Sequence, residues 1–359
     1  MSITALHSRK PTIHVSYVGA VGRHLTRRGL KPAPLYARYG WSVESVDEGQ
    51  IRVPLADFFT LLDAASEYAN DRHLGLHIYE HFDFADLGLL GYALLSATDV
   101  GSALRTLMRY GAIFQDCDDG ELLTERDYAH LFYRINSPSL PPSRHDNDMS
   151  TAFTVFFLRK VVDPYWAPIA VQLQHPTPAA DLREEYERTF RCPVKFGCAT
   201  NQMTMPSSIL SAPIRSSDKR LFDVIERHLR LLQEQSPTEG SFARRVEAAI
   251  KQRLPTGPPS QEAVADVLGL SVRDLQRELA ANSLRFNDLI DVARKELATR
   301  LLVTTGHSLA EIAYLLGYSE ETAFIRAFRR WMNCTPGDYR RSTRDATPSR
   351  AQYRYPRSM

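Results

Sequence analysis

The sequence predicts an α+β N-terminal domain followed by an all-α domain with two helix-turn-helix units. The segment Ala265–Ser271 recurs as Ala313–Ser319 at an offset of 48 residues, and each copy precedes a helix-like stretch that carries arginine. The residues before position 236 instead mix helical apolar spacing with short β-branched and aromatic runs. That mixture is typical of a fold that combines helices with a sheet.

The repeated segment contains the residues that a helix-turn-helix needs. Its alanine allows two helices to cross closely, and its glycine, Gly269 or Gly317, tolerates the left-handed conformation that ends the first helix. Its serine, Ser271 or Ser319, can cap the second helix. The second helix of such a unit can enter the major groove of DNA.

Turn-forming residues divide the chain. The stretch 234–241 predicts an N-terminal sensor/dimerisation domain at 1–235, a linker at 236–241 and an all-α domain at 242–341. A second proline- and glycine-rich stretch, 254–260, separates a first helix from the repeat, where Ser260 can cap the next helix. The predicted smaller parts are helix-turn-helix units at about 261–282 and 309–332 and a disordered basic tail at 342–359.

Apolar spacing predicts the elements of the N-terminal domain. Helices are expected over residues 57–70, 99–114, 149–162, 181–190 and 218–233. Strands are expected over residues 131–135, 169–173, 194–196 and 202–205. A domain of this kind can enclose a pocket.

Bulk composition excludes several classes of protein. No window approaches 18 uninterrupted apolar residues, so we expect a cytoplasmic protein without a membrane segment. The four cysteines are scattered, which favours free thiols and predicts neither a metal nor another cofactor: Cys117, Cys192, Cys198 and Cys334. Residues 242–359 contain 19 Lys and Arg against 13 Asp and Glu, whereas residues 1–241 contain 25 against 29. This asymmetry favours phosphate contacts by the C-terminal part.

Helical spacing sorts the second helix of the first unit into two faces. Leu275 and Leu279 face the partner helix, and Arg273, Gln276 and Arg277 lie on the opposite face. Arginine can make bidentate contacts with guanine, and glutamine can do so with adenine. Ser271, with Asp274 three residues later, predicts a start that is similar to a capping box.

The second unit follows the same plan with a shift of one residue. Ser308 and Glu311 predict a capping box, and beyond Ser319 the inward positions become Phe324 and Phe328, an offset of 49 from the first unit. The exposed face then carries Glu321, Thr322, Arg326, Arg329 and Arg330. Trp331 is expected to close this core, and Thr335 with Pro336 to cap a final short helix.

A long helix is expected between the units, over about 286–304. Nineteen residues span about 28 Å, which approaches the pitch of about 34 Å of one DNA turn. The two exposed faces could therefore enter successive major grooves. Phosphate contacts are expected from Arg294, Lys295, Arg329 and Arg330.

Residues from about 242 to 341 resemble the C-terminal DNA-binding module of the AraC/XylS family of bacterial transcription regulators. The resemblance is carried by the two repeated segments and by Leu275–Arg277, Ser308–Ala313, Arg326–Trp331 and Thr335–Tyr339. It implies base contacts from positions that are here Arg273, Gln276, Arg277, Glu321, Thr322 and Arg326. Glu320 and Glu321 depart from the common polar pattern and repel phosphate, so we expect base contacts chiefly from the first unit.

Residues from about 58 to 233 also resemble the N-terminal domain, labelled arabinose-binding-like, of a subgroup of these regulators. The carrying segments are 74–76, 87–96, 175–178 and 192–197. The resemblance implies a transcription activator and not an enzyme, with double-stranded promoter DNA, RNA polymerase, a small-molecule effector and a second copy of the chain as candidate partners. The label does not establish a sugar as the effector.

Two other functions would also use a DNA-binding module of this kind. The N-terminal domain can dimerise without taking a ligand, and this alternative stays open. An enzyme fused to a DNA-binding module, as in DNA-repair alkyltransferases, needs activated cysteines near the start of the chain, where none occurs before Cys117.

A small polar ligand is suited by a pocket with aromatic walls and one charge. If the N-terminal domain binds an effector, we expect its pocket to be lined by Arg109, Tyr110, Phe114, Tyr133 and Trp166.

Overall fold

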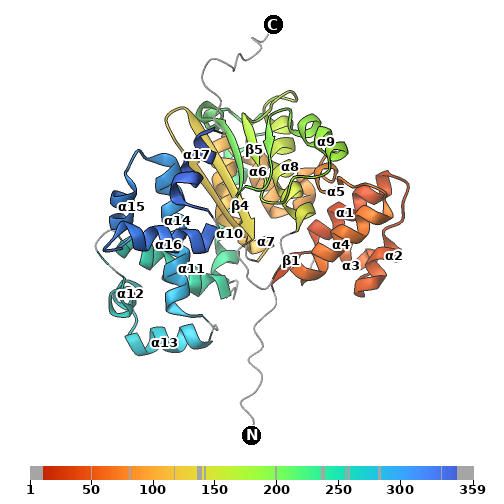
Figure 1. Cartoon of the computed structure of the whole chain (residues 1–359). Coiled ribbons are helices and arrows are strands. Elements are labelled where there is room, and N and C mark those ends of the chain that lie inside the picture. Colours follow the sequence, from red (N-terminus) through yellow and green to blue (C-terminus); the bar gives the residue numbers. More distant parts are fainter. Residues whose placement is uncertain are drawn as a thin grey trace. The chain divides into compact units, whose positions relative to one another are not determined.

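The computed structural model describes residues 11–49, 51–80, 82–116, 118–135, 140, 143–198, 200–235, 239–254, 257, 259–281, 284–332 and 334–345. The chain forms two compact units, which meet in the sequence between Gln235 and Ser236. Figure 1 shows the course of the chain through both units.

The N-terminal unit begins with a small two-stranded antiparallel sheet. Strand β1 (Thr12–His14) pairs with β2 (Arg52–Pro54), and Ile13 faces Val53 in the register. Between these strands lie short helical elements: α1 (Ser16–Arg27), α2 (Ala33–Tyr36), η1 (Ala37–Tyr39) and α3 (Val43–Asp47). Helix α4 (Leu55–Tyr68) follows β2 directly and buries the apolar stripe that the sequence predicts between residues 57 and 70.

A five-stranded sheet forms the centre of this unit. The strand order is β3 (Asp118–Thr124), β4 (Tyr128–Ile135), β7 (Asn201–Pro206), β5 (Ala170–Gln172) and β6 (Val194–Lys195). Neighbouring strands are antiparallel except for β5 and β6, which are parallel. Opposite residues Leu131 and Met203, and Tyr133 and Asn201, share one face because side chains alternate along a strand.

Helices pack around this sheet. Helix α8 (Arg144–Val161) contacts β4 and β7, and α7 (Val100–Phe114) contacts β3. The remaining elements of the unit are α5 (Leu74–His77), η2 (Phe84–Leu87), α6 (Leu89–Ser96), α9 (Ala180–Phe190), η3 (Ser207–Ser211) and α10 (Lys219–Gln235). A β-carbon at Gly75 would lie 2.4 Å from the carbonyl oxygen of His145, so only glycine allows α5 to pack this closely on the start of α8.

The predicted bounds needed corrections at several ends. Helix α8 begins at Arg144 and not at residue 149, because Ser143 caps it by accepting a hydrogen bond from the amide of Asp146. Helix α11 begins at Glu239, inside the segment predicted as a linker. Helix α17 continues to Asp345, so residues 342–345 of the predicted tail are helical, and the rest of that tail lies outside the described residues.

The described part of the C-terminal unit is helical. Its elements are α11 (Glu239–Arg253), α12 (Gln261–Leu268), α13 (Val272–Ala281), α14 (Phe286–Thr304), α15 (Leu309–Leu315), α16 (Glu321–Met332) and α17 (Pro336–Asp345). Helices α12 and α13 form the first helix-turn-helix, and α15 and α16 form the second. None of the helices in the described ranges is long and apolar enough to cross a membrane.

Local signals set the ends of these helices as predicted. Ser260 caps α12, and Ser308 and Glu311 form a capping box at α15. Gly269 and Gly317 have φ values of 67° and 72°, the left-handed conformation that favours glycine after a helix. Thr335 accepts the amide of Asp338 at 3.0 Å and so caps α17.

Candidate DNA-binding surface and ligand cavity

Helix α13 separates an apolar face from a polar one. Leu275 and Leu279 are buried in a cluster with residues of α11, α12 and α14. Arg273, Gln276 and Arg277 are exposed on the other side, as the helical spacing predicts. These three residues therefore present two guanidinium groups and one amide to solvent from a helix that is anchored along its other face.

The start of α13 is organised around Asp274. The Ser271 hydroxyl accepts the amide of Asp274 at 3.1 Å and donates to its carboxylate at 2.7 Å. Nη1 of Arg277 lies 2.8 Å from the same carboxylate. The bond from Ser271 and the charge of Arg277 lower the pKa of Asp274. This arrangement holds Arg277 beside the first turn of the helix.

Gln276 is positioned by a contact with α12. Its Nε2 donates to the side-chain oxygen of Gln261 at 2.8 Å.

Helix α16 has a different distribution of charge. Phe324 and Phe328 are buried, whereas the predicted contact residues are all exposed: Glu321, Thr322, Arg326, Arg329 and Arg330. Glu321 lies in the first turn, and Arg329 and Arg330 lie in the last. This order suits the helix dipole, and it places two of the three arginines of α16 at the end far from the turn.

Two arginines connect the second unit to α14. Arg294 donates from Nε to the carbonyl of Leu316 at 2.9 Å and from Nη2 to that of Gly317 at 3.2 Å. Its guanidinium also lies 4.3 Å from the ring centre of Tyr318. Arg330 donates to Asp291 at 2.5 Å. Both arginines are predicted to contact phosphate, and Arg294 also satisfies carbonyls at the end of α15.

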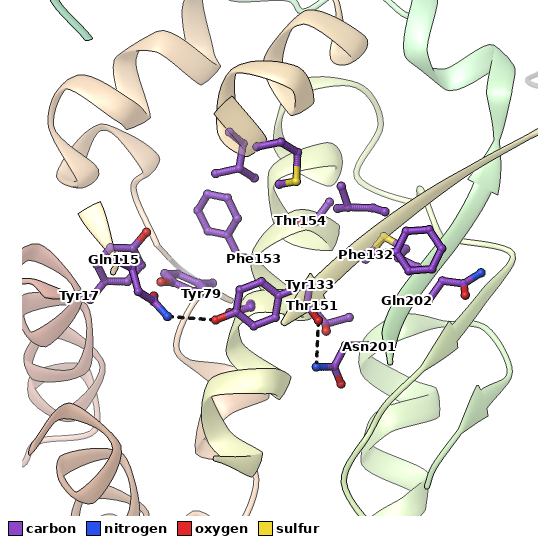
Figure 2. Close-up of a pocket in the computed structure, with 15 residues that line it drawn as sticks. Tyr17, Tyr79, Gln115, Phe132, Tyr133, Thr151, Phe153, Thr154, Asn201 and Gln202 are labelled. Atoms are coloured by element: carbon purple, nitrogen blue, oxygen red, sulfur yellow. Dashed lines mark hydrogen bonds between the residues drawn. The ribbon is translucent and has the colours of Figure 1, made fainter. Parts of the chain in front are cut away.

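The N-terminal unit contains a cavity of about 70 Å³ between the central sheet and helices α7 and α8 (Figure 2). Several aromatic and aliphatic side chains form part of its wall, and neutral polar side chains complete it. The lining residues include Tyr17, Tyr79, Leu107, Met108, Gln115, Leu131, Tyr133, Ser150, Thr151, Phe153, Thr154, Asn201 and Met203.

A chain of hydrogen bonds leads from this wall to a buried carboxyl group. Gln115 donates from Nε2 to the Tyr133 hydroxyl at 3.1 Å, and that hydroxyl donates to Oδ2 of Asp146 at 2.8 Å. Figure 2 shows the bond between Gln115 and Tyr133. Burial raises the pKa of Asp146 to about 7, and hydrogen bonds from Tyr133 and Gln115 oppose this shift.

A second network fixes Asn201 on β7. Its amide nitrogen donates to Oδ1 of Asn147 at 3.0 Å, and its oxygen accepts the amide of Gln174 at 2.9 Å. Thr151 donates to the carbonyl of Asn147 at 2.9 Å. These bonds fix the side chains of Asn201 and Thr151 at the cavity wall.

Of the five residues predicted to line an effector pocket, Tyr133 lines this cavity and the other four do not. Arg109 is exposed and lies 3.8 Å from Glu226, and the buried Tyr110 hydroxyl also faces Glu226, at 3.4 Å. Phe114 packs edge-on against His14, and Trp166 is buried where its carbonyl accepts from Arg159. The prediction missed the residues of α8 and β7, which lie far apart in the sequence and carry no local signal of a pocket.

Comparisons with known proteins agree with this architecture. Residues 29–214 match the family model described as the arabinose-binding domain of AraC transcription regulator, N-terminal, and residues 264–342 match a helix-turn-helix domain model. The first match alone spans more than half of the chain.

Curated relatives match along most of their length. The chain is 27% identical over 314 residues to the HTH-type transcriptional regulator VirS of Mycobacterium tuberculosis, covering 87% of this chain and 91% of that protein. It is 26% identical over 330 residues to the ornithine utilization regulator of Pseudomonas aeruginosa, covering 91% and 96%. These relatives are transcription regulators, which confirms the expectation of a regulator in place of an enzyme.

Among solved structures, the transcriptional regulator CdpR of Pseudomonas aeruginosa is 22% identical with a TM-score of 0.42, covering 91% of this chain and 98% of that one. The first family model matches within the mixed α/β unit described above, and the second matches within the helical unit that contains the two helix-turn-helix motifs. The chain belongs to the AraC family of DNA-binding transcription regulators.

Proposed function

We propose that this protein is a transcription activator in which α13 selects the DNA sequence and the N-terminal unit senses a small molecule. The observation that carries the first part is the set of side chains on the exposed face of α13. Arg273, Gln276 and Arg277 are the residue types that form bidentate contacts with base edges, and the opposite face of the helix is anchored by Leu275 and Leu279.

Helix α16 has a supporting role in this proposal. Thr322 and Arg326 are available for further base contacts, while Arg329 and Arg330 supply contacts to phosphate at the end of the helix. Glu320 and Glu321 precede these residues and weaken the attraction of DNA to the first turn. Phosphate contacts determine how affinity depends on salt, and base contacts determine which site is bound.

The DNA part is tested by selecting a binding site with the full-length protein and measuring affinities for that site and for random DNA. Arg277→Ala should weaken binding to the selected site by about 1–3 kcal/mol and change binding to random DNA little. Arg227→Ala, an exposed arginine on α10, serves as the matched control. An equal loss on both DNAs would mean that Arg277 contacts the backbone and does not select bases.

The sensing part is supported by the cavity, whose wall combines apolar side chains with a few fixed polar groups, as small-molecule sites do. A panel of metabolites should contain a compound that raises the melting temperature of the protein, because a ligand that binds only the native state stabilises it. The same compound should change operator affinity or transcription from the neighbouring promoter by RNA polymerase.

The alternative is an N-terminal unit that only dimerises. Under that alternative no compound changes the melting temperature or operator affinity, while the protein is a dimer in solution by light scattering. A ligand effect on a protein that stays monomeric would instead favour sensing without dimerisation.

A further inference from the structure

The described part of the cavity wall has no charged side chain, and this restricts the ligands that the cavity can bind. None of the fifteen described residues that line the cavity has a formal charge. Moving an isolated charged group from water into such a site costs far more than moving a neutral polar group, unless a partner compensates it. The nearest acidic group in the network, Asp146, lies behind the Tyr133 hydroxyl and is almost fully buried.

Apart from that of Tyr17, the hydroxyl groups of the wall fall into two sets. Tyr133 and Thr151 are already engaged, with Asp146 and Asn147 respectively. Within the described ranges, the hydroxyls of Tyr79, Ser150 and Thr154 make no hydrogen bond. Ser150 and Thr154 are four residues apart on α8 and therefore lie on one side of that helix.

A hydroxyl group both donates and accepts hydrogen bonds, so free hydroxyls can bind either an alcohol or a carbonyl group. They offer no net charge to balance a carboxylate or an ammonium group. Apart from the amide side chains of Gln115, Asn201 and Gln202, the rest of the wall is aromatic or aliphatic, and Figure 2 shows Phe132 and Phe153 as part of it. Such a wall suits an apolar body beside one polar group.

The cavity is also small. Its volume of about 70 Å³ is several times the 10–15 Å³ that a single water molecule needs, and it therefore suits a compact ligand.

We infer that the cavity binds a compact, uncharged alcohol or carbonyl compound with an apolar body, whose polar group is hydrogen-bonded by Ser150 and Thr154. This inference rests on the proposed sensing function and adds the chemical class of the ligand. It also assigns two positions on α8 as the residues that determine specificity.

The test uses three probes that share a body and differ in charge: benzyl alcohol, benzoate and benzylamine. Binding to the full-length protein is measured by calorimetry and by the shift in melting temperature. Benzyl alcohol should bind and stabilise the protein, and the two charged probes should bind at least tenfold more weakly, because a tenfold difference corresponds to only about 1.4 kcal/mol. Tighter binding of benzoate or benzylamine would overturn the uncharged class while leaving a sensing function intact.

Variants then locate the site. Thr154→Val keeps the volume and removes one hydroxyl, and it should weaken benzyl alcohol binding about 2- to 10-fold. Ser150→Phe fills the cavity and should abolish binding, whereas Ser208→Phe on the exposed η3 should leave binding unchanged. Unchanged affinity in Thr154→Val together with retained binding in Ser150→Phe would show that the site is elsewhere.

A complete failure of benzyl alcohol to bind would overturn this inference without deciding the proposed function. That function is judged separately, by whether any member of the metabolite panel changes operator affinity.

Discussion

In the first helix-turn-helix unit α13 rests on the aliphatic side chains of Leu275 and Leu279, whereas in the second unit α16 rests on the rings of Phe324 and Phe328. The structure shows where this difference begins. Helix α13 starts one residue after Ser271, and α16 starts two residues after Ser319. The added residue, Glu320, shifts the frame of the second unit by one.

The shift affects both the core and the exposed face. In the second unit Phe328 contacts the rings of Phe324, Trp331 and Tyr339, with centres 5.5–6.4 Å apart. On the outside, α13 carries arginine near its start and middle, whereas α16 begins with glutamate and ends with two arginines. A duplicated motif can thus keep its backbone while its two copies acquire different cores and different electrostatic roles.

The largest expected effect comes from the aromatic core. Phe328→Ala should destabilise the second unit by about 3–5 kcal/mol, since it leaves a cavity among three rings. Hydrogen exchange in the full-length protein should show lost protection in α15, α16 and α17, with α13 still protected. Leu279→Ala is the matched change in the first unit and should give the reverse pattern. Equal losses in both units would mean that the two cores unfold as one.

Replacing Arg294 should have the next largest effect, and it distinguishes a structural role of this side chain from a contact with phosphate. Arg294→Ala removes two bonds to carbonyls and the contact with Tyr318, so we expect a loss of about 1–3 kcal/mol in the stability of the second unit. Arg294→Lys keeps the charge but cannot reproduce both bonds, and it should not restore stability. If lysine restores DNA affinity and the alanine variant lowers the salt slope by about 1, Arg294 contacts phosphate after all.

The acidic start of α16 should have a smaller effect. Glu321→Gln removes one negative charge from the exposed first turn and should tighten DNA binding by up to about 1 kcal/mol at low salt, with a smaller gain as salt rises. Binding to selected and random DNA is compared at several salt concentrations. Glu187→Gln, which removes the charge of an exposed glutamate on α9, is the control. Weaker binding of the Glu321 variant to the selected site alone would show that Glu321 contacts a base.

The smallest expected effect concerns the pair between Asp291 and Arg330. Both side chains are partly exposed, so Asp291→Asn should cost only about 0.2–1 kcal/mol of stability. The released Arg330 should raise affinity for random DNA slightly at low salt. Asp223→Asn breaks a comparable exposed pair with Lys219 on α10 and should leave DNA binding unchanged. A loss of DNA affinity in Asp291→Asn would show that the pair positions α16 for binding.

The C-terminal unit could be predicted closely because its signals are local. Residues 286–304 were predicted as one helix and form one, and the caps at Ser260, Ser308 and Thr335 are in place. At α12 and α15 a capping serine, a glycine and an apolar stripe all indicate the same boundaries. Agreement among independent local preferences is what makes a segment predictable.

The N-terminal unit was predicted only in part because its signals are not local. Strand β3 was missed, since its first residues include Asp118, Asp119 and Glu121, and it becomes a strand by pairing with β4. Apart from Tyr133, the residues of the cavity wall were missed for the same reason. The wall joins Gln115 just after α7, Thr154 of α8 and Asn201 of β7, and no spacing along the chain connects them.

Helix α14 has a further consequence for the two helix-turn-helix units that it joins. It has 19 residues without an interruption, and each residue of an α-helix turns the chain by about 100°. One inserted residue would therefore rotate α16 about the axis of α14 by that angle, whereas seven inserted residues would nearly restore its direction at a greater distance. If both units contact DNA as proposed, the connecting helix sets the phase between the two contacts, and the spacing of half-sites in the operator should follow its length.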